Sequence, residues 1–189
     1  MAINSQDNQE KLRSQILNSY GKVCYSLTSH EKEIQYLVKL ERNIKLLQIL
    51  LSAISAGTII SVIFEKGIIA TVIASIVSSS LLILNSITLK FDISSDITRH
   101  KNSTNKLWPI REEYLSLLTD FNDLEVVEIR SKRDDLLYRT SEVYSDSPKT
   151  SSKSYKETQK ALKVEEEQFF TNEELDQLLP PELRKNDIK

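Results

Sequence analysis

Cysteine, histidine, glycine and proline are all scarce in this chain of 189 residues. The single cysteine, Cys24, excludes an intrachain disulfide and a cysteine metal cluster. Three glycines and four prolines argue against a loop-rich or all-β fold. The only histidines, His30 and His100, stand among charged residues, where we expect both side chains to be solvated. Without an H-x-x-x-H or Cys/His spacing, the sequence gives no reason to expect a bound metal or another cofactor.

Patterns that indicate catalysis are missing as well. The sequence contains neither a Gly-rich phosphate loop nor a G-x-S-x-G nucleophile elbow. A basic run at 130–133 is followed directly by Asp134 and Asp135, which is typical of a solvated helix face and not of a nucleic-acid interface. The sequence therefore predicts a protein that is not an enzyme and does not bind nucleic acid directly.

Two uncharged apolar runs dominate what the chain does contain. They cover residues 46–64 and 67–89, with only Glu65 and Lys66 between them. A helix rises 1.5 Å per residue, so about 20 apolar residues cross a hydrocarbon core of about 30 Å. We therefore predict a transmembrane helical hairpin in a lipid bilayer. The alternative is a hairpin buried in a soluble domain, which would need far more amphipathic sequence than this chain supplies.

Basic residues flank this hairpin on the side away from its turn. Lys39, Arg42 and Lys45 precede the first run, while Lys90 and Arg99 follow the second. Because positively charged flanks stay in the cytoplasm, we expect both termini to be cytoplasmic, with two spans between them. The first 45 residues show no cleavable signal peptide, so the hairpin itself must direct insertion.

The remaining sequence predicts an all-α protein in which cytoplasmic helices form a bundle. Residues 1–45 form an N-terminal helical segment, 46–89 the hairpin, 90–144 a helical bundle, and 145–189 a linker with a short helical tail. Ser29 is expected to cap a second helix, and Pro109 to kink or restart another. Apolar residues at spacings of three and four predict the packing faces. These are Leu12, Ile16, Tyr20, Val23 and Leu27, then Ile93 and Ile97, then Ile110, Tyr114, Leu117, Leu118, Phe121 and Leu124, and finally Val126 or Val127, Ile129, Leu136, Leu137, Thr140 and Val143.

The tail carries a helix signal of its own beyond the Ser- and Lys-rich stretch 145–158. Thr171 and Glu174 form a capping box, and Pro180 ends the helix near residue 179. Its apolar residues predict either a docking motif for a partner or a strap across this chain's own bundle. The residues concerned are Phe169, Phe170, Leu175, Leu178 and Leu179.

Polar residues form a stripe on each run of the hairpin. The stripes consist of Gln48, Ser52 and Ser55 on the first run, and of Thr71, Ser75, Ser78, Asn85 and Ser86 on the second. Small and polar side chains at this spacing let helices pack closely in lipid. They also suit the lining of a water-filled opening, which two helices cannot enclose alone and which requires a homo-oligomer. Both interpretations stay open at this point.

The order of these segments resembles the SLATT family, whose members are two-transmembrane effector domains of bacterial conflict systems. The resemblance covers residues 12–165 and includes the segment LRSQILNSYGKVCYSL, the hairpin with its charged turn, and HKNSTNKLWPIREEYLSLLTD. The family's pattern then has an arginine-bearing helix, a proline-containing turn and a tyrosine. In this sequence these are Arg130 or Arg133, Pro148 and Tyr155.

The resemblance implies an effector of the bacterial inner membrane that acts against phage by abortive infection. Such an effector oligomerises to form a pore or disrupt the membrane when a cytoplasmic sensor or enzyme triggers it. A reverse transcriptase or a nucleotide-signal synthase encoded nearby is the partner that the family's gene neighbourhoods imply, and one branch of the family accompanies reverse transcriptases. The alternative is a non-lethal anchor that docks a cytoplasmic enzyme or sensor through its bundle and tail.

Overall fold

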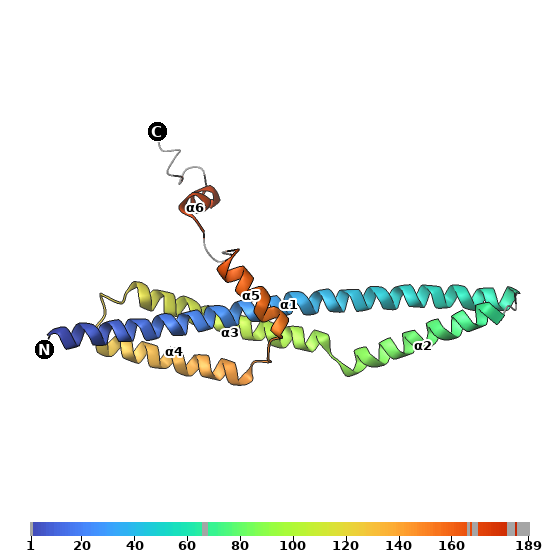
Figure 1. Cartoon of the computed structure of the whole chain (residues 1–189), viewed down its shortest axis with the longest axis horizontal. Coiled ribbons are helices and arrows are strands. Elements are labelled where there is room, and N and C mark those ends of the chain that lie inside the picture. Colours follow the sequence, from blue (N-terminus) through green and yellow to red (C-terminus); the bar gives the residue numbers. More distant parts are fainter. Residues whose placement is uncertain (1, 66–67, 166, 168–169, 181–183, 185–189) are drawn as a thin grey trace.

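The structure, a computed structural model, describes residues 2–65, 68–165, 167, 170–180 and 184 (Figure 1). Every regular element in these ranges is a helix, which confirms the all-α prediction. The helices are α1 (Ala2–Glu65), α2 (Ile68–Lys90), α3 (Ile93–Thr119), α4 (Val126–Asp146), α5 (Ser152–Lys163) and α6 (Asn172–Leu178).

Helix α1 is the longest helix, and every other helix except α6 packs against it. Its 64 residues span about 96 Å at 1.5 Å per residue, so one helix links the bundle to the hairpin. The expected helix start at Ser29 is wrong, because α1 continues through this residue and buries its side chain. No proline lies anywhere in α1, and only Gly21 weakens it before Gly57, so nothing ends the helix at Ser29.

The chain returns along α1 in two helices, α2 and α3 (Figure 1). The sequence predicted one stripe that continues through Ile93 into the cytoplasm, but α2 ends at Lys90 and α3 begins at Ile93. Asp92 causes this break, because its side chain accepts a hydrogen bond of 2.9 Å from the Ser95 amide and so caps a new helix. The break separates the apolar hairpin from the bundle.

Pro109 lies inside α3 and does not restart it, so that part of the expectation is wrong. A proline in a helix frees the carbonyl four residues earlier, which here belongs to Asn105. Asn105 and Pro109 line the same open surface cavity beside α4, where water can reach that region. The helix can therefore continue through the proline at a position that solvent covers.

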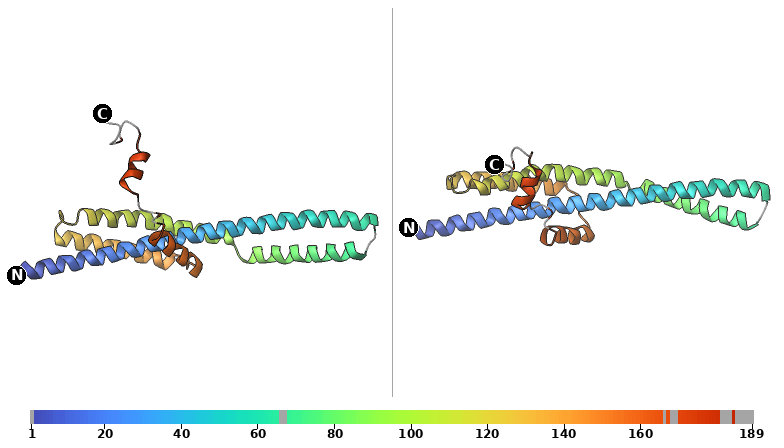
Figure 2. Two further views of the ribbon diagram at one scale, coloured as in Figure 1. Left: turned by 45° about the horizontal axis from the view of Figure 1, so that its top comes forward. Right: turned by 90° about the horizontal axis from the view of Figure 1, so that it is seen from above.

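The core lies where the first half of α1 meets α3 and α4, which pack side by side in Figure 2. The predicted stripes supply most of it. Its buried residues are Leu12, Ile16, Val23, Leu27, Leu107, Ile110, Tyr114, Leu117, Phe121, Ile129, Leu136 and Val143. Of the two valines left open, Val126 packs against this core and Val127 is exposed. Leu137 is also exposed, so its assignment to the packing face is wrong.

The stretch expected to be a linker, 145–158, contains a helix. Helix α4 runs to Asp146, α5 begins at Ser152 and packs against α1, and only residues 147–151 connect them. Farther along, the predicted capping box of α6 is confirmed, since Thr171 and Glu174 exchange both hydrogen bonds. Phe169 lies outside the residues that the structure describes.

Candidate membrane hairpin and polar cluster

Helices α1 and α2 pack as an antiparallel pair along a narrow seam. The side chains that each helix partly covers recur every three or four residues, which is the spacing of a coiled-coil contact. They are Ile44, Gln48, Leu51 and Ser55 on α1, and Ala74, Val77, Leu81, Leu84 and Thr88 on α2. Gln48 and Ser55, two of the predicted stripe residues, therefore face the partner helix.

Polar side chains join the two helices at two levels of this seam. Gln48 Nε2 donates to Asn85 Oδ1 at 2.9 Å and to Thr88 Oγ1 at 3.2 Å. About two turns farther along α1, Ser55 Oγ and Ser78 Oγ lie 3.3 Å apart. Because an amide without a partner is costly in lipid, the Gln48–Asn85 pair fixes the register of the hairpin.

The remaining stripe residues lie on the outside of the pair. Thr71, Ser75 and Ser86 are exposed on one flank of α2, beside the seam. The hydroxyls of Ser75 and Ser86 donate to the carbonyls of Thr71 and Leu82 at 2.9 Å and 2.8 Å, so each is satisfied within its own helix. Ser52 is exposed on α1. The predicted stripe thus divides into four residues that pack the hairpin and four that face away from it.

The surface that the hairpin exposes is largely apolar. Among the residues that the structure describes, one helical stretch, beginning at Thr71, is long and apolar enough to cross a bilayer, and none of its apolar window is buried in the chain. The described exposed side chains of α1 beyond residue 45 are also largely apolar, with Leu46, Ile49 and Leu50 about half or more exposed. Apolar surface of this extent marks a membrane or protein contact.

His30 and His100 contradict the expectation that both are solvated. Each is 3 % exposed, and their Nδ1 atoms lie 2.7 Å apart between α1 and α3. Burial, aided by His100, lowers the pKa of His30 to about 4, and burial also lowers the pKa of His100. Both rings are therefore neutral at pH 7, so one nitrogen donates and the other accepts. Their spacing after Leu27 and Ile97, in step with the buried stripes, is the sequence signal that could have revealed this.

The histidines belong to a polar cluster at the membrane-proximal end of the bundle. Glu33 is buried, and one of its carboxylate oxygens accepts a hydrogen bond of 2.7 Å from the Ser151 amide. Burial would raise the pKa of Glu33, but hydrogen bonds from Ser151 and Ser154 outweigh it and lower that pKa. Ser147 Oγ donates to Ser103 Oγ at 2.8 Å. The polar cluster, His30, Glu33, His100, Ser103, Ser147 and Ser151, thus joins α1, α3 and the α4–α5 connection.

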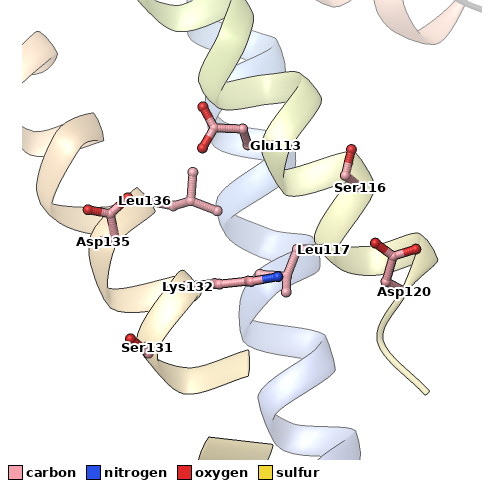
Figure 3. Close-up of a pocket in the computed structure, with 8 residues that line it drawn as sticks. All are labelled: Glu113, Ser116, Leu117, Asp120, Ser131, Lys132, Asp135 and Leu136. Atoms are coloured by element: carbon pink, nitrogen blue, oxygen red, sulfur yellow. The ribbon is translucent and has the colours of Figure 1, made fainter. Parts of the chain in front are cut away.

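A surface cavity between α3 and α4 gathers several carboxylates, but they do not form a site. Glu113, Asp120 and Asp135 line it together with Lys132, and Figure 3 shows the three acids spread around its rim and not converging on one point. Arg139 binds Glu113 through two contacts of 2.6 Å and 2.7 Å. Across the described part of the chain, no three His, Cys, Asp or Glu side chains are placed to hold a metal ion.

The family assignment follows from a comparison of the whole chain. A family model described as SMODS and SLOG-associating 2TM effector domain family 4 matches residues 12–174. The chain belongs to this family. Membership in the SLATT family makes it an effector domain associated with a membrane, in agreement with the exposed apolar hairpin. Neither a curated protein nor a solved structure matches the chain.

The SLATT motif positions of the sequence come to two places in the fold. Arg130 is exposed on α4, whereas Arg133 is half-buried and donates to Gln15 of α1 at 2.9 Å. Pro148 and Tyr155 meet at a cavity beside the polar cluster, which His30 also lines. The proline and tyrosine therefore mark the place where α5 turns onto α1.

Proposed function

We propose that this SLATT protein is an inner-membrane effector whose hairpins assemble, when triggered, into an opening that depolarises the membrane. The observation that supports this most is the division of the polar stripe. One part of it holds α1 and α2 together. The other part faces outward and consists of Ser52 on α1 and of Thr71, Ser75 and Ser86 on one flank of α2. A hairpin that needed polar residues only for its own packing would not need the second part.

The outward flank is suited to both lipid and water. The hydroxyls of Ser75 and Ser86 each donate a hydrogen bond to the carbonyl four residues earlier in α2. A single hairpin in lipid therefore leaves neither of these donors unpaired. Each hydroxyl oxygen can still accept a hydrogen bond from water if copies gather with this flank inward. Two helices cannot enclose an opening, so the proposal requires several copies of the chain.

The cytoplasmic bundle is the part that would receive the trigger. Basic flanks on both arms of the hairpin favour two spans with both termini in the cytoplasm of a bacterium, and in this orientation a sensor could reach the bundle and α6. We further propose that the trigger comes from a cytoplasmic partner, such as a nucleotide-signal synthase or a reverse transcriptase. We also propose abortive infection as the outcome, which agrees with the family's description as effector domains.

A non-lethal membrane anchor is the second candidate function. The exposed apolar residues of the tail favour it, since Phe170 just before α6 and Leu178 in α6 are 60 % and 71 % exposed and offer a docking surface that does not depend on an opening. On this alternative the hairpin only holds the bundle at the membrane. Membrane depolarisation separates the two functions.

The experiment replaces polar residues of α2 by Leu in two groups and measures both membrane potential and oligomer size. Leu suits both lipid and a helix, so insertion should survive. Replacing Thr71, Ser75 and Ser86 should abolish depolarisation on expression with the neighbouring genes and leave the oligomer intact. Replacing Asn85 should weaken the hairpin itself, because Gln48 loses its amide partner.

Ser80→Leu is the matched control. Ser80 is also an exposed serine that donates to its own helix, but it lies about 140° around α2 from Ser75 at 100° per residue. It should leave depolarisation unchanged. Undiminished depolarisation in the Thr71, Ser75 and Ser86 variant would show that this flank lines no opening, and absence of depolarisation in the unaltered system would leave the anchor function.

A further inference from the structure

A groove along α1 is uncovered although its lining is suited to a partner. We call it the tyrosine groove. It consists of a cavity of about 660 Å³ lined by Leu17, Asn18, Gly21, Lys22, Tyr25, Tyr144, Tyr155 and Lys163. The three tyrosines also line an adjoining cavity of about 460 Å³ that reaches His30 and Lys149. The groove thus runs between α1, the end of α4 and the side of α5.

The charge of the groove is all of one sign. Lys22, Lys149 and Lys163 line the two cavities, and no Asp or Glu is among the described residues that do so. This is unusual in a chain that has 27 acidic residues and a net charge of −2. Aromatic side chains between lysines favour an occupant that is acidic and apolar at once.

Gly21 indicates that the occupant approaches α1 closely. It lies inside a long helix, where glycine costs about 1 kcal/mol relative to alanine. No neighbour in the described part of the chain requires a glycine here, because a Cβ atom built at Gly21 would meet nothing within 4 Å. A glycine at the floor of an open groove therefore fits a backbone or side chain that comes from outside the described fold.

The chain itself carries a segment with the required chemistry. Residues 165–179 contain six acidic residues and no basic ones, together with two phenylalanines and three leucines. In this segment α6 is capped at Thr171, and Figure 1 shows it standing away from the bundle. A helix of seven residues is marginal alone in water, so its exposed apolar face needs a surface.

The geometry points to the groove of a second copy as that surface. Glu167 is bound to Lys32 at 2.7 Å, which holds the start of the tail at a point on α1 about 16 Å from Gly21. Beyond Glu167, α6 stands away from the bundle (Figure 1), so in this structure the tail leaves the groove of its own chain uncovered.

We therefore propose that the acidic tail, residues 165–179, docks into the tyrosine groove of a neighbouring copy. A contact between two different surfaces is head-to-tail, and such contacts build rings when the rotation closes. The proposal goes beyond the function above, because it concerns the cytoplasmic contact between copies and holds whether or not the hairpins open the membrane.

Photo-cross-linking of two tagged full-length chains in detergent tests this contact. The donor chain carries p-benzoylphenylalanine in place of Leu178, and the acceptor carries a larger tag and an unaltered groove. Illumination should give a donor–acceptor adduct whose cross-link maps near Tyr25, Tyr144 or Tyr155. An acceptor with Gly21→Trp should lower the yield at least tenfold and keep its melting temperature, because the added side chain starts in open space.

Charge variants provide the matched control. Lys22→Glu with Lys163→Glu in the acceptor should also lower the adduct at least tenfold, whereas Lys11→Glu with Lys132→Glu, two exposed lysines outside the groove, should not. The proposal would be overturned if no adduct formed or if the cross-link stayed within one chain. It would also be overturned if the adduct mapped outside the groove, or if the blocked acceptor gave an equal yield. Depolarisation without the adduct would overturn the docking alone, and the adduct without depolarisation would contradict only the proposed opening.

Discussion

At the scale of single residues, two neutral imidazoles replace what would otherwise be an apolar contact between α1 and α3. His30 and His100 lie 2.7 Å apart and are almost fully buried, with the buried carboxylate of Glu33 one turn along α1. Burying a polar ring is tolerated when it has a hydrogen-bond partner and is costly when the ring must also carry charge. The pair is therefore compatible with the fold only while both rings stay neutral.

The first prediction is that the protein loses stability between pH 6.5 and pH 4. The pKa of His30 falls from its ordinary value of 6.5 to about 4 on folding, so over this range the unfolded chain binds a proton that the folded chain does not. The contribution of neutral His30 to the free energy of unfolding is complete above pH 6.5. It decreases by about 1.4 kcal/mol per pH unit as the pH falls towards 4. Unfolding at pH 7 and pH 5, followed by circular dichroism in detergent, should differ by about 2 kcal/mol.

A variant with His30→Gln and His100→Gln controls for the pH dependence that the Asp and Glu residues contribute to the free energy of unfolding. The pKa values of Glu33 and Glu113 are lowered below 4.5, so their contributions to stability are lost only at more acidic pH. Partial desolvation raises the pKa of Glu31, which favours the folded chain as the pH falls, so the variant should lose no stability between pH 7 and pH 5. An unchanged pH dependence would show that the histidines are not the groups that titrate.

At the scale of elements, α5 is held on α1 by small and polar side chains. Ser154, Thr158 and Ala161 are buried at their contact, and Glu33 binds the amide at the helix start. Small residues bury little apolar area, so hydrogen bonds carry a larger share of this contact than in the core. The docking of α5 therefore depends on single polar groups.

The second prediction is that Glu33→Ala releases α5 and leaves the bundle folded. A hydrogen bond to a charged group is worth about 1.5–3 kcal/mol, and its loss leaves the Ser151 amide without this acceptor. Hydrogen exchange should show faster exchange of the amides in α5 and unchanged protection in α3. Glu31→Ala, which removes an exposed carboxylate two residues earlier, should leave α5 protected. Equal exchange in both variants would contradict the role of Glu33.

Helices with strong apolar periodicity could be predicted from the sequence, and those held by small residues could not. The stripe from Ile110 predicted the last part of α3 and its core, because large residues at spacings of three and four allow one packing face. Helix α3 ends at Thr119, however, so Phe121 and Leu124 pack from the turn that follows it. The first part of α5 falls in the predicted linker 145–158, because its buried side chains are Ser and Thr, which are also typical of linkers. Ser29 resembled a cap because a hydroxyl suits both a cap and a buried helix position.

The candidate site was predictable as a set of residues but not as an arrangement. The polar stripe residues follow from the sequence, whereas their division depends on where the seam lies between α1 and α2. The sequence shows which residues share a face of a helix, but not which other helix that face contacts. Asn85 and Ser75 therefore cannot be told apart from the sequence, and only the structure shows that Asn85 binds Gln48. For the same reason, the partnership of His30 and His100, 70 residues apart, needs the three-dimensional fold.

At the scale of the whole molecule, the third prediction concerns orientation in the membrane. Lys39, Arg42 and Lys45 precede the hairpin and Lys90 follows it, so the positive-inside rule places both arms on the cytoplasmic side. Reporter fusions after Lys189 should give cytoplasmic signals, and a reporter inserted at Lys66 should give a periplasmic signal. A periplasmic C-terminus would contradict the orientation and place α6 beyond the reach of a cytoplasmic sensor.

The last prediction is that the full chain forms an oligomer. A hairpin of two helices leaves most of its apolar side chains exposed, and lipid can cover these as well as the outward flank of Thr71, Ser75 and Ser86, but this flank can line an opening only in an assembly. Only neighbouring copies can surround that flank with water, and a head-to-tail contact in the cytoplasm would set their spacing. Native mass spectrometry in mild detergent should therefore show several copies, and removal of residues 165–189 should reduce the assembly without changing the helix content of the bundle. A chain that stays monomeric, alone and with its partner, can anchor a bundle at the membrane but cannot open it.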